Sequence, residues 1–271
     1  MSATTDGFGI RSRNNVRESG SPDARPLVFV HGFGCSQEMW RDVAPAFETD
    51  HRVITFDQVG AGGSDLAAYD RGKYDSLHGY AADLLEILAE LDLRDAVIVG
   101  HSVSAMTAVL AAGRDSSRIG ALVLIGPSPH YLNEPGYTGG FSREDIDSLL
   151  DALDANYFGW SQSMAPVIMG TGNDIALQAE LTDSFCTTDP DIARHFARVT
   201  FLSDNRRDLD RVTLPTLILQ CKDDPIAPEA VGEYVHARIA GSALTVLDAT
   251  GHCPHLSAPG LVVRELREFL R

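Results

Sequence analysis

The chain has 271 residues, of which 44% are hydrophobic and 22% are charged, a composition typical of globular proteins and unlike that of disordered or collagenous chains. Its 22 lysine and arginine residues against 38 aspartate and glutamate residues give a net charge of −16. Such an acidic chain disfavours binding to nucleic acid or to an anionic membrane surface. The length is sufficient for one large α/β domain with an insertion.

The four cysteines, Cys35, Cys186, Cys221 and Cys253, carry no metal or disulfide signal, because they form neither a CxxC pair nor a Cys/His ligand spacing. The first 25 residues lack the apolar segment of a signal peptide. No stretch approaches the roughly 18 apolar residues of a membrane span. We therefore expect a cytoplasmic protein with reduced thiols and with no metal or cofactor.

Short apolar runs bounded by glycine and proline predict buried strands along the chain. These runs cover residues 27–30, 53–56, 96–99, 121–125, 214–219 and 244–247. Helical patterns separate several of them, as in residues 79–91, where Leu84, Leu85, Leu88 and Leu91 share one face. Strands that alternate with helices indicate an α/β fold with a mostly parallel sheet.

The first of these predicted strands ends in His31-Gly-Phe-Gly-Cys35. A glycine-rich turn between a strand and a helix is one interpretation of this segment. The other is a turn that points the backbone amide of Phe33 at a reacting carbonyl group, as one half of an oxyanion hole. The second interpretation depends on a nucleophile further along the chain.

A candidate nucleophile follows the strand at residues 96–99, in the sequence Gly100-His-Ser102-Val-Ser104. A strand that passes through Gly-x-Ser into an alanine-rich helix is typical of a nucleophile elbow, whose small flanking residues let the strand and the helix approach. Taken alone, Ser102 is better explained as a helix-capping serine. In the elbow interpretation, the amide of Val103 is the second oxyanion donor, and His101 has no proton-transfer role.

The interval of residues 127–211 interrupts the alternation, because no convincing strand occurs there. Ser142 and Asp145 resemble a capping box, and Asp189-Pro190 is a capping residue followed by proline at the first helical position. We therefore predict a helical insertion. Residues 157–169 are apolar on more than one face, as expected of a helix that lines a cavity, although ordinary helix packing explains the pattern equally well.

An acid and a histidine each follow a late predicted strand. Asp223 and Asp224 follow residues 214–219, and His252 and His255 follow residues 244–247. The offset of Asp224 from Pro228 favours Asp224 as the acid, and the preceding Gly251 favours His252 as the base. The chain order Ser102, Asp224, His252 is the order that a nucleophile elbow requires, and these residues have the chemistry of a serine nucleophile, its base and an orienting carboxylate.

From Asn14 onward the chain resembles the α/β-hydrolase family, and within it the subgroup of the sigma-B regulator RsbQ and the plant strigolactone and karrikin receptors. The motifs that carry the resemblance are HGFGC at 31–35, GHSVSAM at 100–106, GPSP at 126–129, YLN at 131–133, FCTTDP at 185–190, LILQC at 217–221 and GHCPHLS at 251–257. The elbow is closer to the plant receptors, whereas the set as a whole is closer to RsbQ.

The resemblance implies a core formed by residues 1–134 and 199–271 and a four-helix lid at 135–198 that covers an apolar pocket. The pocket residues that it implies are Phe33, His101, Val103, Tyr131, Trp160, Met164 and Phe201. It also implies a small hydrophobic ligand and, for an RsbQ-like protein, a partner such as a phosphatase with a PAS domain.

Two functions follow as hypotheses. The first is a serine hydrolase that acts on a small hydrophobic ester or lactone. The second, which rests on the resemblance, is a ligand-responsive signalling protein in which slow hydrolysis recruits a partner. Cofactor-free haloperoxidase and carbon–carbon bond hydrolase chemistry use the same three residues and stay open.

Overall fold

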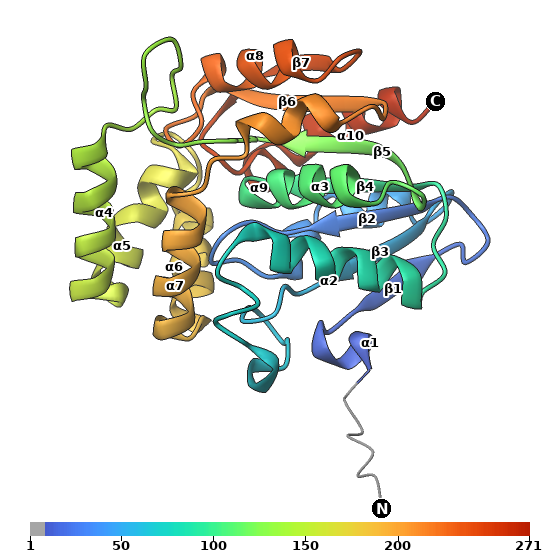
Figure 1. Cartoon of the computed structure of the whole chain (residues 1–271), viewed down its shortest axis with the longest axis horizontal. Coiled ribbons are helices and arrows are strands. Elements are labelled where there is room, and N and C mark those ends of the chain that lie inside the picture. Colours follow the sequence, from blue (N-terminus) through green and yellow to red (C-terminus); the bar gives the residue numbers. More distant parts are fainter. Residues whose placement is uncertain (1–8) are drawn as a thin grey trace, which may run out of the picture.

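One seven-stranded sheet forms the centre of the computed structural model, which describes residues 9–271 (Figure 1). The strands are β1 (Arg17–Gly20), β2 (Pro26–Val30), β3 (Arg52–Phe56), β4 (Ala96–His101), β5 (Ile119–Ile125), β6 (Thr216–Asp223) and β7 (Ala243–Thr250). Their order across the sheet is β1-β3-β2-β4-β5-β6-β7. The edge strand β1 pairs antiparallel with β3, and the other pairs are parallel.

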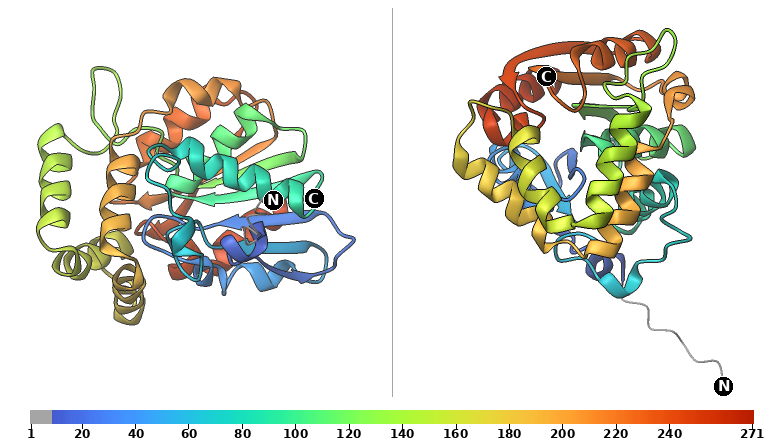
Figure 2. Two further views of the ribbon diagram at one scale, coloured as in Figure 1. Left: turned by 60° about the horizontal axis from the view of Figure 1, so that its bottom comes forward. Right: turned by 90° about the vertical axis from the view of Figure 1, so that its left-hand side faces the viewer.

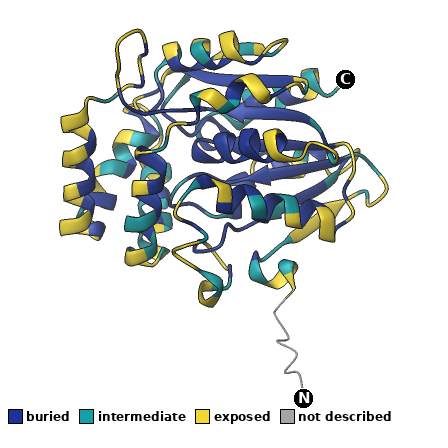
Figure 3. Cartoon of the chain, viewed as in Figure 1, coloured by how far each residue is buried: buried dark blue, intermediate teal, exposed yellow. Residues whose placement is uncertain are grey.

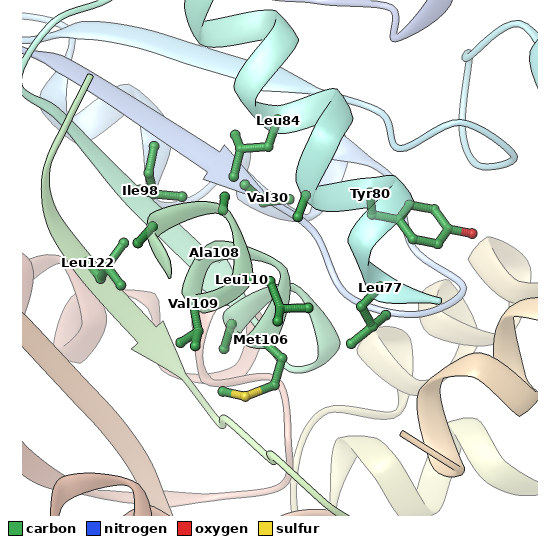
Figure 4. Close-up of a cluster of buried hydrophobic side chains, with 14 of the residues drawn as sticks. Val30, Leu77, Tyr80, Leu84, Ile98, Met106, Ala108, Val109, Leu110 and Leu122 are labelled. Atoms are coloured by element: carbon green, nitrogen blue, oxygen red, sulfur yellow. The ribbon is translucent and has the colours of Figure 1, made fainter. Parts of the chain in front are cut away.

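Alternating side chains along each strand divide the core into two layers, because successive residues of a strand point to opposite faces. The helices are α1 (Ile10–Arg13), α2 (Leu77–Glu90), α3 (Val103–Arg114), α4 (Arg143–Ala155), α5 (Tyr157–Met169), α6 (Ile175–Thr187), α7 (Pro190–Phe201), α8 (Glu229–Arg238), α9 (Pro254–Ser257) and α10 (Pro259–Phe269). Val28 and Ile98 pack with α2, α3 and α8, whereas Leu27 and Val97 pack with α10 and residues 40–47. Figure 4 shows part of the first layer, where Leu84 of α2 and Val109 of α3 lie near Ile98.

Four helices, α4 to α7, lie between β5 and β6 in the chain and gather beyond the carboxyl ends of the parallel strands (Figures 1 and 2). We call these four helices the lid. The capping box predicted at Ser142 and Asp145 opens α4, and Asp189 caps α7 with Pro190 in the first turn. The apolar face of α4 is buried while its outward face is exposed, so the lid has a core of its own (Figure 3).

All six predicted apolar strands are present in the structure, and four details differ from the prediction. The edge strand β1 was not predicted, because all four of its residues are exposed and none forms an apolar run. The helix predicted at 79–91 runs from Leu77 to Glu90, and β6 begins at Thr216 after Pro215. Helix α7 continues to Phe201, so the predicted boundary at 198/199 falls inside it. Residues 1–8 of the predicted core lie outside the described residues.

None of the helices within residues 9–271 combines the length and the apolar character needed to cross a membrane.

Candidate active site

Ser102 occupies a strained turn between β4 and α3. Its φ of 56° lies in the left-handed region that side chains other than glycine rarely adopt. A Cβ at Gly100 would collide with the backbone carbonyl of Ser104, so the strand and helix can meet at this angle only with glycine there. The amide of Ser102 donates to the carbonyl of Ile125 on β5 at 2.8 Å. The sheet therefore fixes the backbone of Ser102 in the conformation of a nucleophile elbow.

His252 lies in the loop after β7 and contacts Ser102. Its Nε2 is 2.7 Å from Ser102 Oγ, and both residues are almost fully buried. The backbone amide of His252 donates to the carbonyl of Ile168, at 2.8 Å, near the end of lid helix α5. The imidazole is thus held between the core and the lid.

Asp224 lies in the loop that follows β6, where both of its carboxylate oxygens have partners. Oδ2 is 2.7 Å from His252 Nδ1. Oδ1 accepts from the amides of Ile226 at 2.8 Å and Ala227 at 3.0 Å. With Nδ1 protonated and donating to Asp224, His252 Nε2 is free to accept the hydroxyl proton of Ser102.

The structure distinguishes the two candidates for the acid and the two candidates for the base. Asp223 is exposed at the end of β6, whereas the Asp224 side chain is inaccessible. His255 is fully buried against Trp40, with ring centroids 4.6 Å apart, and contacts neither Ser102 nor Asp224 through a hydrogen bond within the described residues. Ser102, His252 and Asp224 form one hydrogen-bonded line at the carboxyl ends of the strands, where α/β sheets bind ligands.

The two predicted oxyanion donors flank this line. Val103 is the first residue of α3, so its amide has no acceptor inside the helix. Phe33 follows Gly32, and a Cβ on Gly32 would stand 3.4 Å from Ser102 Cβ, which places this turn directly beside the serine. The Phe33 ring points into the lid, where it lies 6.1 Å from Trp160 edge-on.

His101 is hydrogen-bonded to the backbone of His252. Its Nε2 donates to the backbone carbonyl of His252 at 2.8 Å. Burial, followed by the neighbouring His255 and His252, lowers the pKa of His101 well below its ordinary value, so it is neutral. Its proximity to Ser102 and its neutral state agree with a role in packing and positioning.

His101, Cys253 and His255 are a buried group whose chemistry could hold a metal, with candidate ligand atoms within 4.8 Å of one another. Burial lowers the pKa of His255 to about 3 and raises that of Cys253 well above its usual range, so imidazole and thiol are both neutral. The backbone of Gly32 lies against His101 Nδ1, because a Cβ there would stand 2.6 Å from it. The group therefore has the packing of core side chains, and the absence of a metal stays a prediction.

A small cavity of about 40 Å³ lies next to Ser102 and His252, with room for roughly three water molecules. It is lined by Phe33, Cys35, His101, Ser102, Tyr131, Trp160, Met164, Ile168, Leu181, Phe185, Thr200, Phe201, Ile226, His252 and Cys253. No lysine, arginine or carboxylate side chain of the described residues lines it. Burial raises the pKa of the Tyr131 phenol to about 12, so this group is protonated at neutral pH.

Most of the pocket residues implied by the resemblance lie in this cavity, and Val103 does not. Its side chain packs in the core with residues of α2 and α3 and is absent from the cavity wall. Residues 157–169 were expected to line a cavity because they are apolar on several faces. Two of these apolar residues, Phe158 and Val167, are instead 50% and 46% exposed and do not line the cavity.

Sequence reasoning missed seven lining residues, namely Cys35, Ile168, Leu181, Phe185, Thr200, Ile226 and Cys253. Cys35, Phe185 and Cys253 lie inside the motifs that carried the resemblance, so their positions could have indicated them. Leu181 and Thr200 lie on lid helices, where only the rotation of each helix decides which residues face the cavity.

Comparison with known proteins places these observations in a family. The strigolactone esterase of Pisum sativum is 39% identical over 262 residues, covering 96% of this chain and 97% of that protein. The karrikin insensitive 2 receptor IA of Petunia hybrida is 38% identical over 240 residues, covering 88% of each. The solved structure of a hydrolase from Oleispira antarctica matches with a TM-score of 0.94 and 42% identity, covering 96% of each chain.

The likeness to the plant strigolactone and karrikin proteins that the motifs predicted is thereby confirmed. The model of the alpha/beta hydrolase family matches residues 27–265, which include Ser102, Asp224, His252 and the whole lid. The chain belongs to the alpha/beta hydrolase family.

Proposed function

We propose that this chain is a serine hydrolase that cleaves small, uncharged, hydrophobic esters or lactones through an acyl-enzyme on Ser102. The observation that carries the proposal is the hydrogen-bonded line from Asp224 through His252 to Ser102 beside a small apolar cavity. Relatives named esterase, with 36–39% identity, support the choice of an ester bond.

In the first half of the reaction, Ser102 Oγ attacks the ester carbonyl while His252 Nε2 takes the hydroxyl proton. Asp224 stabilises the imidazolium that forms, and its orientation is fixed by the amides of Ile226 and Ala227. The amides of Phe33 and Val103 stabilise the oxyanion, and His252 then returns the proton to the leaving alcohol.

In the second half, water attacks the acyl group on Ser102. His252 takes a proton from this water and gives it to Ser102 Oγ as the acid is released. A lactone follows the same steps, but its leaving alcohol remains attached to the acyl group. No metal or cofactor is required at any step.

The cavity supports the uncharged, apolar character of the substrate. A carboxylate or ammonium group would enter it without an opposite charge among the described lining residues, and burial of an unpaired charge is unfavourable. The ring of Phe33 and those of Trp160 and Phe201 enclose the space, so a short acyl chain fits best.

The test is hydrolysis of 4-nitrophenyl acetate, butyrate and octanoate by the wild type and by Ser102→Ala. We expect kcat to fall at least about 10⁴-fold in Ser102→Ala, because the nucleophile is lost. Ser257→Ala, which removes a hydroxyl bonded to the Cys253 carbonyl, is the matched control and keeps wild-type turnover. Equal rates for wild type and Ser102→Ala would refute the proposal.

A second candidate is an RsbQ-like, ligand-responsive signalling protein whose partner, such as a phosphatase with a PAS domain, recognises the conformation of the lid. One observation favours it: lid helix α5 is bonded to the loop of His252, through Ile168 and through Asn173 Nδ2, which donates to the carbonyls of Met169 and Thr250 at 2.7 and 2.8 Å. Acylation of Ser102, next to His252, would therefore affect the hydrogen bonds that join this loop to the lid.

The kinetics of the same esters separate the two candidates. A Ser102-dependent kcat/KM of roughly 10⁴ M⁻¹s⁻¹ or more supports a metabolic hydrolase. A stoichiometric burst followed by turnover well below about 1 s⁻¹ supports a receptor that retains its acyl group.

A further inference from the structure

Two lid residues that line the cavity each carry a buried polar group without a protein partner among the described residues. They are the hydroxyl of Thr200 on α7 and the indole N–H of Trp160 on α5. Thr200 is 1% exposed and Trp160 is 6% exposed. Buried polar groups in native proteins are almost always hydrogen-bonded, so two such groups on one cavity are a feature that needs an explanation.

Thr200 differs from the other helical threonines that the structure describes with bonded hydroxyls. The hydroxyls of Thr107 and Thr182 donate to the carbonyl four residues earlier in their own helices, at 3.5 and 2.9 Å, and the hydroxyl of Thr187 donates to the carbonyl of Ser184 at 2.7 Å. Threonine commonly makes this bond in a helix. The hydroxyl of Thr200 has no protein partner among residues 9–271 although its side chain lines the cavity, so it is free to bond to a ligand.

The indole of Trp160 is held rigidly by its neighbours. Its ring stacks on Tyr157 at 6.3 Å, meets Phe33 edge-on at 6.1 Å and lies 5.6 Å from Phe185. The direction of its N–H is therefore set before a ligand binds. An indole N–H can only donate, and a threonine hydroxyl can donate as well, so both groups suit an acceptor oxygen.

We propose that Thr200 and Trp160 form a polar subsite for a second oxygen of the substrate, a carbonyl or ether oxygen separate from the ester that Ser102 attacks. The inference rests on the proposed hydrolase function and narrows its substrate class to neutral esters or lactones with an additional acceptor oxygen. A carboxylate does not fit, because no cationic side chain of the described residues lines the cavity.

The test compares ester pairs that differ by one oxygen: 4-nitrophenyl pentanoate with its 4-oxo derivative, and 4-nitrophenyl butyrate with 4-nitrophenyl methoxyacetate. The measured quantity is the preference for the oxygenated ester, given by the ratio of the two kcat/KM values. We expect Thr200→Val to reduce this preference roughly three- to tenfold for at least one pair, the value of one neutral hydrogen bond. Each protein's rate on the hydrocarbon ester serves as its own reference, so a general change in activity cancels in the ratio.

Three further variants show whether the hydroxyl itself is responsible. Thr200→Ser keeps a hydroxyl and retains the wild-type preference, whereas Trp160→Phe lowers the preference by removing the indole N–H. Thr182→Val removes a hydroxyl that is bonded inside lid helix α6 and leaves the preference unchanged. Equal preferences in the wild type and Thr200→Val for both ester pairs would overturn the proposal.

A binding measurement keeps this inference separate from the proposed function. Titration calorimetry compares methyl pentanoate with methyl 4-oxopentanoate on Ser102→Ala and on Ser102→Ala with Thr200→Val. A preference for the oxo ester that is lost with Thr200→Val supports the subsite even if Ser102 proves not to be the nucleophile. No difference between the two proteins contradicts the subsite, whatever the hydrolysis rates show.

Discussion

The candidate active site depends on how individual residues are constrained. The two oxygens of Asp224 have different partners: Oδ1 accepts two backbone amides and Oδ2 faces His252 Nδ1. An asparagine at this position would keep its oxygen on the amides and turn its NH₂ group toward His252. The imidazole would then have to accept at Nδ1 and carry its proton on Nε2, which is the wrong tautomer for removing a proton from Ser102.

From this geometry we predict that Asp224→Asn lowers kcat for 4-nitrophenyl butyrate about 10⁴-fold, with a smaller effect on KM. The neighbouring Asp223 is exposed, so Asp223→Asn is a matched control with unchanged kcat. Steady-state kinetics and thermal unfolding of both variants provide the measurement. Activity of Asp224→Asn within tenfold of the wild type would exclude Asp224 as the orienting acid.

At the scale of elements, the close approach of β4 and α3 is what exposes Ser102. Gly100 permits it, because any Cβ there would collide with the first turn of α3. On the same helix, Gly113 has open space, since its nearest contact would be 3.7 Å away on Arg211. The two glycines therefore differ in whether the fold requires them.

We predict that Gly100→Ala destabilises the protein by about 1–3 kcal/mol through overpacking and lowers kcat about 10²-fold, because the serine is displaced. Gly113→Ala leaves activity unchanged and adds up to about 1 kcal/mol of stability, since alanine is the better helix residue. Urea unfolding and ester hydrolysis of the two variants are the measurements. A Gly100→Ala protein with wild-type stability and rate would show that the elbow tolerates a side chain.

The sequence predicted an element correctly where neighbouring residues along the chain carry its signal. Apolar runs predicted the buried strands, and capping residues predicted the starts of α4 and α7. The exposed edge strand β1 has no such signal, because pairing with β3 rather than its own composition makes it a strand. Likewise, nothing local to Thr200 distinguishes its hydroxyl from that of Thr182; the difference arises from which side of each helix meets the cavity.

At the scale of the whole molecule, three segments far apart in the chain converge because each follows a parallel strand of one sheet. That topology allowed Ser102, Asp224 and His252 to be predicted together from short motifs. The cavity has no comparable sequence signal, since it is formed where the lid helices pack on the core. Sequence reasoning therefore identified the residues at the strand ends better than those of the cavity wall.

The same convergence buries two neutral histidines, His101 and His255, next to the site. Their burial makes the stability of the fold depend on pH. Within residues 9–271, His255 forms no ion pair: its ring packs against Trp40 and His101, and the nearby His252 and Arg41 disfavour its protonation. Its pKa is about 3 in the folded protein, against about 6.5 in an unfolded chain. Below pH 6.5 the unfolded chain takes up a proton that the folded protein does not, so stability is complete above this pH and decreases as the pH falls.

We predict that His255 alone lowers the free energy of unfolding by about 1.4 kcal/mol between pH 7.5 and pH 5.5, and that His101 adds to the loss in the same direction. In His255→Phe, which keeps an aromatic ring against Trp40, the decrease over this range should be smaller than in the wild type by that amount. Trp40→Phe alters the same contact without removing a titratable group and should retain the wild-type decrease. Urea unfolding at the two pH values measures both, and an identical decrease in wild type and His255→Phe would mean that His255 is protonated equally in the folded and unfolded chain.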